Sequence, residues 1–376
     1  MENQTPKSLI EHFSVLDDPR IDRSKRHKLI DILVIAICAT ICGADGWEDF
    51  ELFGNCKLDW FKSFLELPHG IPSPDTFRRV FARLDPHQFQ EAFLDWVRSI
   101  TRLIDGQVIA IDGKQLRRSH DSASGKSAIH MVSAWAEENR LVLGQTKVDE
   151  KSNEITAIAE LLRLLEISGC IVTTDALGCQ TEITAAIIQK QADYVLAVKG
   201  NQNYLFEDLV GYFDWALGDL CKQTTYTTDE TVEGDHGRVE VRRCYATEDI
   251  AWLRRKAEWK SIRSIAMVES GRSVGGQEAS RERRYYISSL EADAKQLNRV
   301  IRGHWSIENS LHWVLDIAFR EDDSRIRKDH GPENMATLRH IALNLLKQDK
   351  SIKVGIKSKR KNAGWDERYL LKVLNG

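Results

Sequence analysis

Two predicted strands end in an aspartate, and these two aspartates are the strongest indication of chemistry in the sequence. Ile109-Ala-Ile-Asp112-Gly and Val172-Thr-Thr-Asp175-Ala both run from apolar residues into an aspartate that a small residue follows. If the strands are parallel neighbours, about 4.8 Å apart, the carboxylates meet at the edge of the sheet where ligands bind. Two close carboxylates repel unless a proton or a cation bridges them, and oxygen ligands favour Mg²⁺ or Mn²⁺. The alternative is that each aspartate only caps the turn that follows it.

A later predicted helix could supply a third acidic group. Four of its polar side chains recur at a spacing of four residues: His304, Glu308, His312 and Asp316. At this spacing they form one stripe that drifts by about 40° per step. The alternatives are a salt-bridged surface or a zinc site. A shared zinc ion is disfavoured because His304 and His312 are two turns, about 12 Å, apart along the helix.

The elements that must position these residues predict an α/β protein. Residues 1–105 are predicted to be mostly helical, and apolar strands alternate with helices from residue 106 onward. The predicted strands of this part are Val108–Ile111, Ile129–Ala136, Leu141–Val148, Cys170–Thr174 and Tyr194–Val198. Strands separated by helices indicate a parallel component with right-handed crossovers, and the turn at Glu137–Arg140 indicates an antiparallel hairpin.

The second half of the chain predicts an all-β insertion at about 220–292, followed by helices. Its short strands are Arg238–Tyr245, Ser264–Val268 and Tyr285–Ser289. Helical periodicity resumes near Asp293 and continues through Asp316. We therefore expect a helical N-terminal domain at 1–105, a catalytic domain at 106–346 and a basic C-terminal tail at 347–376.

Charge is distributed unevenly along the 376 residues, although the net charge is only −3. Residues 1–219 carry 23 cationic and 33 anionic side chains, and residues 220–376 carry 30 and 23. This asymmetry is a cue for a nucleic-acid partner.

Seven cysteines without a CxxC pair indicate a reducing compartment. The charge-free run Ile32–Cys42 is too short to span a bilayer, so we expect a buried helix, no membrane association and a cytoplasmic protein.

These motifs carry a resemblance to a known family. The chain resembles a DDE transposase of a bacterial insertion sequence, and most closely the H-repeat-associated proteins of Rhs elements. The resemblance extends over nearly the whole chain, and its last motif is the most specific. The matching segments are Ala110-Ile-Asp-Gly-Lys114, Thr173–Gln180, Asp193–Gln202, His236-Gly-Arg-Val-Glu240 and Ile301–Trp313.

The resemblance implies an RNase H-like mixed sheet flanked by helices, with the β insertion before the helix that bears Glu308. It implies that Asp112, Asp175 and Glu308 are the catalytic residues and the metal ligands, binding Mg²⁺ with Mn²⁺ as a substitute. The implied activity is metal-dependent cleavage at inverted-repeat ends and strand transfer by phosphoryl transfer. The implied partners are double-stranded DNA, comprising terminal inverted repeats and target DNA, and a second copy in a synaptic homodimer. The protein would work in the bacterial cytoplasm, nucleoid-associated when bound to DNA.

Six residues near these motifs are candidate DNA contacts: Lys114, Lys199, Arg238, Arg302, His304 and Trp305. Cations beside the triad motifs could contact phosphates, and the indole could stack on an unpaired base or pack within the protein. The N-terminal domain is the expected DNA-end-binding part. In related insertion-sequence transposases, a tyrosine, an arginine and a lysine stand where this sequence has Ile301, His304 and Leu315. Detailed strand handling therefore does not carry over from that wider group.

Two other functions remain open from the sequence. One is a transposase-derived DNA-binding protein without catalytic activity, which would shift DNA without nicking it. The other is a metal-dependent hydrolase of a small phosphate ester. DNA affinity that falls steeply with salt would count against the hydrolase.

Overall fold

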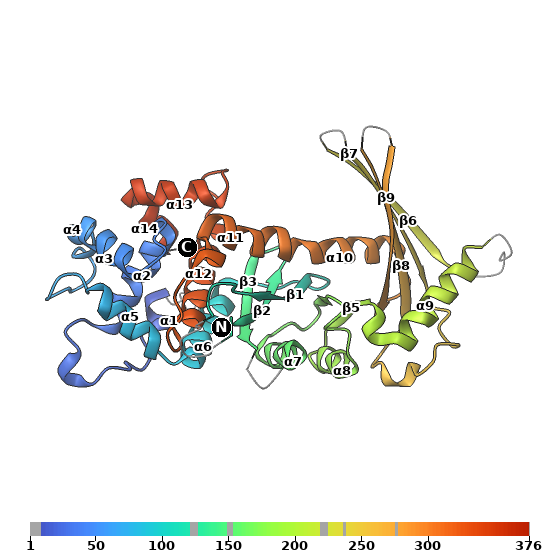
Figure 1. The fold of residues 1–376 in the computed structure, drawn as a ribbon, viewed down its shortest axis with the longest axis horizontal. Coiled ribbons are helices and arrows are strands. Elements are labelled where there is room, and N and C mark those ends of the chain that lie inside the picture. Colours follow the sequence, from blue (N-terminus) through green and yellow to red (C-terminus); the bar gives the residue numbers. More distant parts are fainter. Residues whose placement is uncertain are drawn as a thin grey trace, which may run out of the picture.

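The computed structural model describes residues 9–120, 127–148, 153–218, 225–235, 238–274 and 277–375. A group of helices forms one end of an elongated molecule, and a sheet extends from it to the other end (Figure 1). Nine helices make up this group: α1 (Leu9–Phe13), α2 (Leu29–Cys42), α3 (Trp47–Cys56), α4 (Leu58–Phe61), α5 (Pro74–Arg83), α6 (Pro86–Ile100), α12 (Gly331–Gln348), α13 (Ile356–Trp365) and α14 (Glu367–Asn375).

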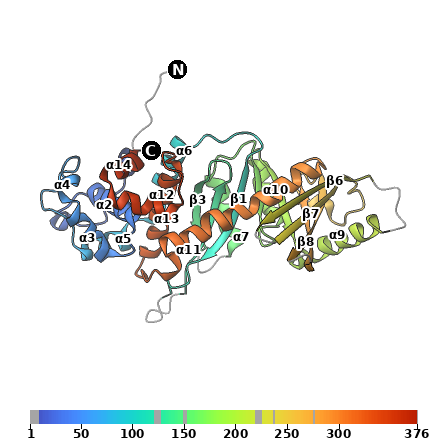
Figure 2. The same cartoon turned by 90° about the horizontal axis from the view of Figure 1, so that it is seen from above.

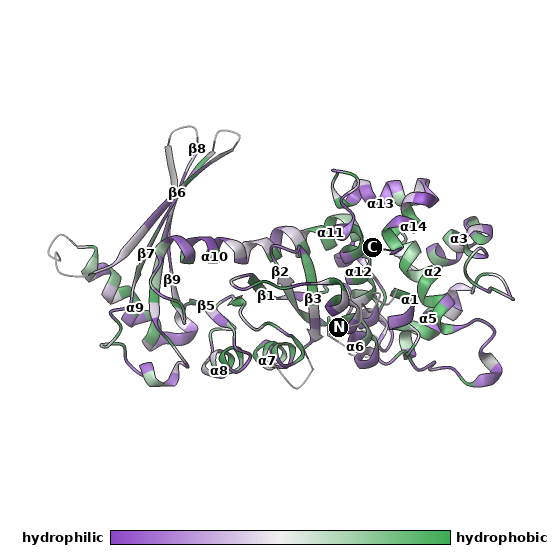
Figure 3. Cartoon of the chain, turned by 180° about the vertical axis from the view of Figure 1, so that it is seen from behind, coloured by the Kyte–Doolittle hydropathy of each residue, from purple (hydrophilic) through white to green (hydrophobic). Residues whose placement is uncertain are grey.

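Helix α2 lies at the centre of the helical end. Its charge-free run is almost wholly buried, as the sequence predicted, and α12, α13 and α14 pack around it. Figure 3 shows the contrast between the hydrophobic α2 and the hydrophilic α13. Among the described residues, no single helix is long and apolar enough to cross a membrane. The predicted helical character of the N-terminal region is confirmed.

The basic segment 347–376 folds into α13 and α14 and packs against α2. Two of its cations are buried. The Lys359 Nζ donates to the carbonyl of Leu346 at 2.9 Å, and the Arg360 guanidinium donates to the carbonyl of Thr40 at 2.8 Å. These two side chains stabilise the docking of the segment and are not exposed to solvent.

Nine strands in the described part of the chain form one mixed sheet in the order β3-β2-β1-β4-β5-β9-β8-β7-β6. Only β1–β4 and β4–β5 are parallel pairs. The strands are β1 (Val108–Gln115), β2 (His130–Ala136), β3 (Leu141–Lys147), β4 (Ile171–Thr174), β5 (Asp193–Val198), β6 (Thr227–Asp235), β7 (Arg238–Thr247), β8 (Ser264–Val274) and β9 (Gln277–Ser288). The predicted parallel component and the β2–β3 hairpin are confirmed. Strand β6 was not predicted, and β6–β9 continue the main sheet through the antiparallel β5–β9 pair.

Helices cover both faces of the sheet. The crossovers α7 (Glu154–Leu164) and α8 (Thr181–Gln189) lie on one face, and α9 (Asn203–Ala216) packs on β9. On the other face, α10 (Ala294–Ile307) crosses the strands and contacts β1 most extensively (Figure 2). It continues through a π-helical turn, Glu308–His312, into α11 (Trp313–Phe319). The predicted helix is therefore interrupted by a π turn at its acidic residue, a feature that often marks functional sites.

A buried asparagine attaches the edge strand β3 to α12. The Asn344 side chain accepts from the backbone N–H of Val142 at 2.9 Å and donates to its carbonyl at 2.8 Å. Asn344 is completely buried, and both backbone groups of Val142 face away from β2. The amide thus satisfies two polar groups of a strand that has no further neighbouring strand on this side among the described residues.

We expect Asn344→Ala to lower the free energy of unfolding by about 2–4 kcal/mol, because two buried backbone groups lose their partners. Chemical denaturation followed by circular dichroism measures this change. A loss below 1 kcal/mol would show that the amide does not secure β3.

Candidate active site

The parallel strands β1 and β4 bring the two aspartates together. Ile111 pairs with Thr174 in parallel register, so Asp112 and Asp175 follow at the same level of the sheet. The Asp175 Oδ1 accepts from the backbone N–H groups of Leu177 at 3.0 Å and Gly178 at 3.3 Å. Asp175 therefore caps its turn and also lies at the same level of the sheet as Asp112, and its role as a cation ligand stays a prediction.

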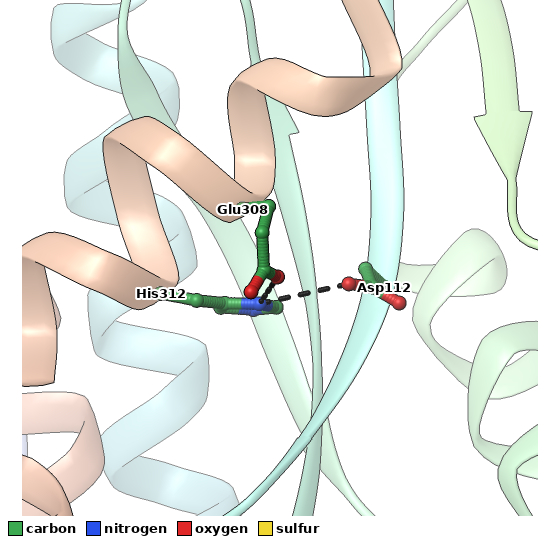
Figure 4. A group of neighbouring side chains, drawn as sticks. All are labelled: Asp112, Glu308 and His312. Atoms are coloured by element: carbon green, nitrogen blue, oxygen red, sulfur yellow. Dashed lines mark hydrogen bonds and ion pairs between the residues drawn. The ribbon is translucent and has the colours of Figure 1, made fainter. Parts of the chain in front are cut away.

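The π-helical turn places a glutamate and a histidine over Asp112. The His312 Nδ1 lies 3.1 Å from the Glu308 Oε2 and 3.6 Å from the Asp112 Oδ2 (Figure 4). Among the described residues, donor atoms of Asp112, Glu308 and His312 all lie within 4.8 Å of one another. His312 is 5% exposed, whereas the Glu308 side chain is 57% exposed. The histidine is thus a fixed part of the site, and the glutamate is open to solvent.

The electrostatics of the site show how strongly its carboxylates interact. Burial, together with the nearby charges of Asp175 and Glu308, raises the pKa of Asp112 to about 6, although His312 acts in the opposite direction. The hydrogen bond from His312 lowers the pKa of Glu308. Bringing these acidic groups together therefore costs free energy that a positive charge between them would recover.

The donor set fits a divalent cation. Asp112 and Glu308 offer carboxylate oxygens and His312 offers an imidazole nitrogen, which are ligands that Mn²⁺ accepts, and Mg²⁺ accepts the oxygens. Asp175 lies outside the 4.8 Å group but lines the same pocket. The second histidine of the stripe, His304, also lies outside the 4.8 Å group, and its Nδ1 lies 3.0 Å from the Thr173 hydroxyl.

A pocket of about 300 Å³ opens beside the carboxylates. All three predicted triad residues line it, and its rim carries Lys199 and Arg284. The Arg284 guanidinium lies over the Trp305 ring, 4.9 Å from its centroid, and the indole remains 38% exposed. The pocket thus combines an acidic floor with a cationic and aromatic wall.

The predicted DNA contacts have different surroundings. Lys199 is exposed at the pocket, and the Arg302 guanidinium forms an ion pair with Glu233 of β6 at 2.6 Å. Burial lowers the pKa of His304 to about 4, so its imidazole is neutral. Lys114 is bound by acidic side chains, and the side chain of Arg238 lies outside the described residues. Contact of these residues with DNA stays a prediction.

The departures from the wider transposase pattern are part of the core. Ile301 and Leu315, which stand at positions that are polar in that pattern, are 2% and 1% exposed. Ile301 also contributes to the apolar wall of the pocket. Packing therefore accounts for both side chains.

Two residues near Asp112 were missed by sequence reasoning. Glu154 begins α7, and its Oε2 lies 3.4 Å from the His130 Nε2 of β2. A Cβ on Gly113 would lie 2.5 Å from that nitrogen and 2.7 Å from the Glu154 carboxyl carbon, so a larger residue would displace both side chains. Burial and the charges of Asp175 and Asp112 raise the pKa of Glu154 to about 7. The Asp-Gly pair was the available signal, because a glycine inside a strand often marks close approach of other groups.

Burial of the Asp112 carboxylate, with the nearby charges of Asp175 and Glu308, predicts a pH-dependent cost in the free energy of folding of the metal-free protein. The pKa of Asp112 is raised from 3.8 to about 6, so the unfolded chain releases this proton more easily than the folded one. The free energy of unfolding therefore falls as pH rises through this range. We expect Asp112→Asn to raise the melting temperature by roughly 1–3 °C at pH 7.5 in EDTA, and by less at pH 5.

Differential scanning calorimetry of the chain and of the exposed control Asp59→Asn tests this. The control should melt like the unchanged protein at both pH values. A lower melting temperature for Asp112→Asn than for the unchanged protein at pH 7.5 would contradict the predicted cost of the charged Asp112 carboxylate.

Comparison with known proteins identifies families whose models match this chain. The family described as "Transposase DDE domain" matches residues 98–345, and "DDE_Tnp_1-associated" matches residues 10–97. The chain is 41% identical over 376 residues to "H repeat-associated putative transposase YhhI" of Escherichia coli strain K12, covering 98% of each. It is 44% identical over 236 residues to "H repeat-associated putative transposase YbfD" of the same strain, covering 63% of this chain and 92% of that one.

Among solved structures, a piggyBac transposase synaptic complex with hairpin DNA aligns at a TM-score of 0.43 and 12% identity, covering 95% of this chain and 76% of that chain. The two sequence families together cover the chain from residue 10 to residue 345, and the resemblance inferred from its motifs is confirmed. The chain belongs to the DDE transposase family, with H-repeat-associated relatives.

Proposed function

We propose that this protein is a metal-dependent DNA transposase that cleaves at inverted-repeat ends and transfers the cut strand to target DNA. The observation that carries the proposal is the convergence of Asp112, Asp175 and Glu308 on one pocket with a cationic rim. Membership in the DDE transposase family supports the same activity. The RNase H-like class is supported by the mixed order β3-β2-β1-β4-β5 with crossovers α7 and α8.

The reaction we propose consists of two phosphoryl transfers. In the first, water attacks a phosphodiester at the end of the element, and the bond from phosphorus to the 3′ oxygen breaks to leave a 3′-hydroxyl. In the second, that hydroxyl attacks a phosphodiester of the target, and one phosphorus–oxygen bond replaces another. A bound divalent cation would supply Lewis-acid polarisation of the phosphodiester and a lowered pKa for water.

The chain's own residues position the substrate and the cation. Asp112, Asp175 and Glu308 would bind Mg²⁺, or Mn²⁺ in its place, and His312 orients the Glu308 carboxylate by a hydrogen bond. Lys199 and Arg284 line the pocket and would contact phosphates of a bound strand, and Arg284 would then leave its ion pair with Glu282. The exposed face of Trp305 is available to stack on a base.

DNA-end binding by the N-terminal helices is supported by a second pocket, of about 410 Å³, between α5 and the segment that follows α11. Its lining includes four cations, Arg78, Arg325, Arg327 and Lys328, and two acidic residues, Asp45 and Glu48. Arg78 also pairs with Asp75 at 2.6 Å, so Arg325, Arg327 and Lys328 are the cations we propose for contact with a phosphate backbone. Synapsis of two ends by a homodimer, in the bacterial cytoplasm, completes the proposal on the basis of the family.

The triad predicts a specific loss of catalysis. We expect Asp112→Ala, Asp175→Ala and Glu308→Ala each to reduce Mg²⁺-dependent cleavage of inverted-repeat DNA by at least about 100-fold, because each removes a carboxylate that binds the cation. The control Glu182→Ala removes an exposed carboxylate at the start of α8 and should cleave normally. Gel analysis of end-labelled DNA measures the rate.

Cleavage at the unchanged rate by any triad variant would refute that residue's assignment. Binding of inverted-repeat DNA by the unchanged protein without any nicking would instead favour a DNA-binding protein that lacks catalytic activity.

Lys199 tests the cationic rim independently of catalysis. We expect Lys199→Ala to weaken DNA binding and to reduce the slope of log K against log salt by about 1, because one phosphate contact is lost. The matched control, Lys295→Ala, removes an exposed lysine at the start of α10. Fluorescence anisotropy over a salt series gives both values. An unchanged slope for Lys199→Ala would remove this residue from the interface.

A further inference from the structure

Lys114 stands on β1 two residues beyond Asp112, so both side chains lie on the same face of the strand. Asp316 stands on α11 four residues beyond His312. Two residues of a strand span about 6.6 Å and four residues of a helix about 6 Å, so the two spacings match. Where the helix crosses β1, Asp112 contacts His312. Lys114 and Asp316, which lie further along the strand and the helix, contact each other in the same way.

The second contact is part of a buried charge network. The Lys114 Nζ forms a short ion pair with Asp316, lies 2.9 Å from the Glu321 Oε2 and lies 3.8 Å from the Asp322 Oδ1. The Lys114 side chain is only 13% exposed. Glu321 is 3% exposed and lies 3.6 Å from the guanidinium of Arg339 on α12, which is also 3% exposed. The network thus joins β1 to α11, to the segment after it and to the helical end of the molecule.

We propose that Lys114 is a positioning residue that holds the helix bearing Glu308 in register over β1 and thereby sets the separation of Asp112 and Glu308. The inference rests on the proposed function, because it concerns the same site. It gives Lys114 a role different from the phosphate contact that the sequence suggested.

The surroundings of Lys114 favour positioning over DNA contact. Its ammonium group has three donors, and acidic side chains surround it. Moving it to a phosphate would leave Glu321 with only the Arg339 guanidinium in a buried environment, which is costly. The lysine therefore stays bound to the network.

The effect of removing Lys114 should appear in metal binding. Residues that orient metal ligands typically contribute about 10–100-fold to metal affinity. We expect Lys114→Met to weaken Mn²⁺ binding by at least about 10-fold, and Lys114→Arg, which can keep the ion pairs, to stay within about 3-fold of the unchanged protein. Asp316→Asn removes one partner and should weaken binding by a smaller factor.

The test is a Mn²⁺ titration of the full chain without DNA, followed by electron paramagnetic resonance of the free ion. Lys147→Met is the matched control, because Lys147 also links a strand of this sheet to α12, through Glu333 at 4.0 Å. It should bind Mn²⁺ like the unchanged protein. If Lys114→Met does not fold, as judged by circular dichroism, Asp316→Asn decides, and unchanged Mn²⁺ binding by it overturns the proposal.

DNA binding separates the two roles of Lys114. In metal-free buffer, positioning predicts that Lys114→Met binds inverted-repeat DNA with unchanged affinity and salt slope. Unchanged Mn²⁺ binding by Lys114→Met overturns the proposal. A salt slope smaller by about 1 also overturns it and favours a phosphate contact. If the unchanged protein itself binds no Mn²⁺, the metal site of the proposed function fails as well. If the unchanged protein and Lys114→Met both bind Mn²⁺ normally, the positioning role of Lys114 is refuted and the metal site of the proposed function is not.

Discussion

The partial burial of several acidic side chains close together at one edge of the sheet is the constraint on which the site depends. Parallel pairing of β1 and β4 places Asp112 beside Asp175, and the π-helical turn adds Glu308 from above. Glu154 adds a further carboxyl group nearby. The raised pKa values of Asp112 and Glu154 show that the fold maintains this charge density at a cost in free energy. A protein gains from such an arrangement where cations and phosphates bind.

The surrounding structure can be understood as support for this strained group. His312 lies between two of the carboxylates and is held by burial in the core. Gly113 leaves the space that Glu154 and His130 occupy. Two residues further along β1, the ion pairs of Lys114 and Glu321 connect this strand to α11 and α12. The helical end of the molecule is thereby connected to the site, because Arg339 of α12 pairs with Glu321 in this network.

The sequence predicted those parts of the site that strand periodicity determines. Apolar runs ending at Asp112 and Asp175 are local signals, and their parallel pairing follows from the intervening helices. Glu308 was identified through the spacing of its polar stripe and through the family motif. The fold class was predicted for the same reason, since strands and helices alternate along the catalytic part of the chain.

The remaining features depend on contacts between distant segments, which periodicity does not report. Glu154 reaches Asp112 only because β2, β3 and α7 fold back beside β1. Lys114 looked like a free cation beside a motif, and its acidic partners lie some 200 residues later in the chain. The burial of Lys359 and Arg360 in the basic C-terminal segment was not predicted. It depends on hydrogen bonds to backbone carbonyls, which have no sequence signature.

The central claim is that the carboxylate cluster is a divalent-cation site for DNA chemistry. The most direct measurement is anomalous X-ray diffraction at the manganese edge from crystals grown with Mn²⁺ and inverted-repeat DNA. We expect a peak bounded by Asp112 and Glu308, with a phosphate of the DNA beside it and the strand entering past Lys199. A structure with DNA bound but with no manganese among these carboxylates, or with manganese only elsewhere, would contradict it.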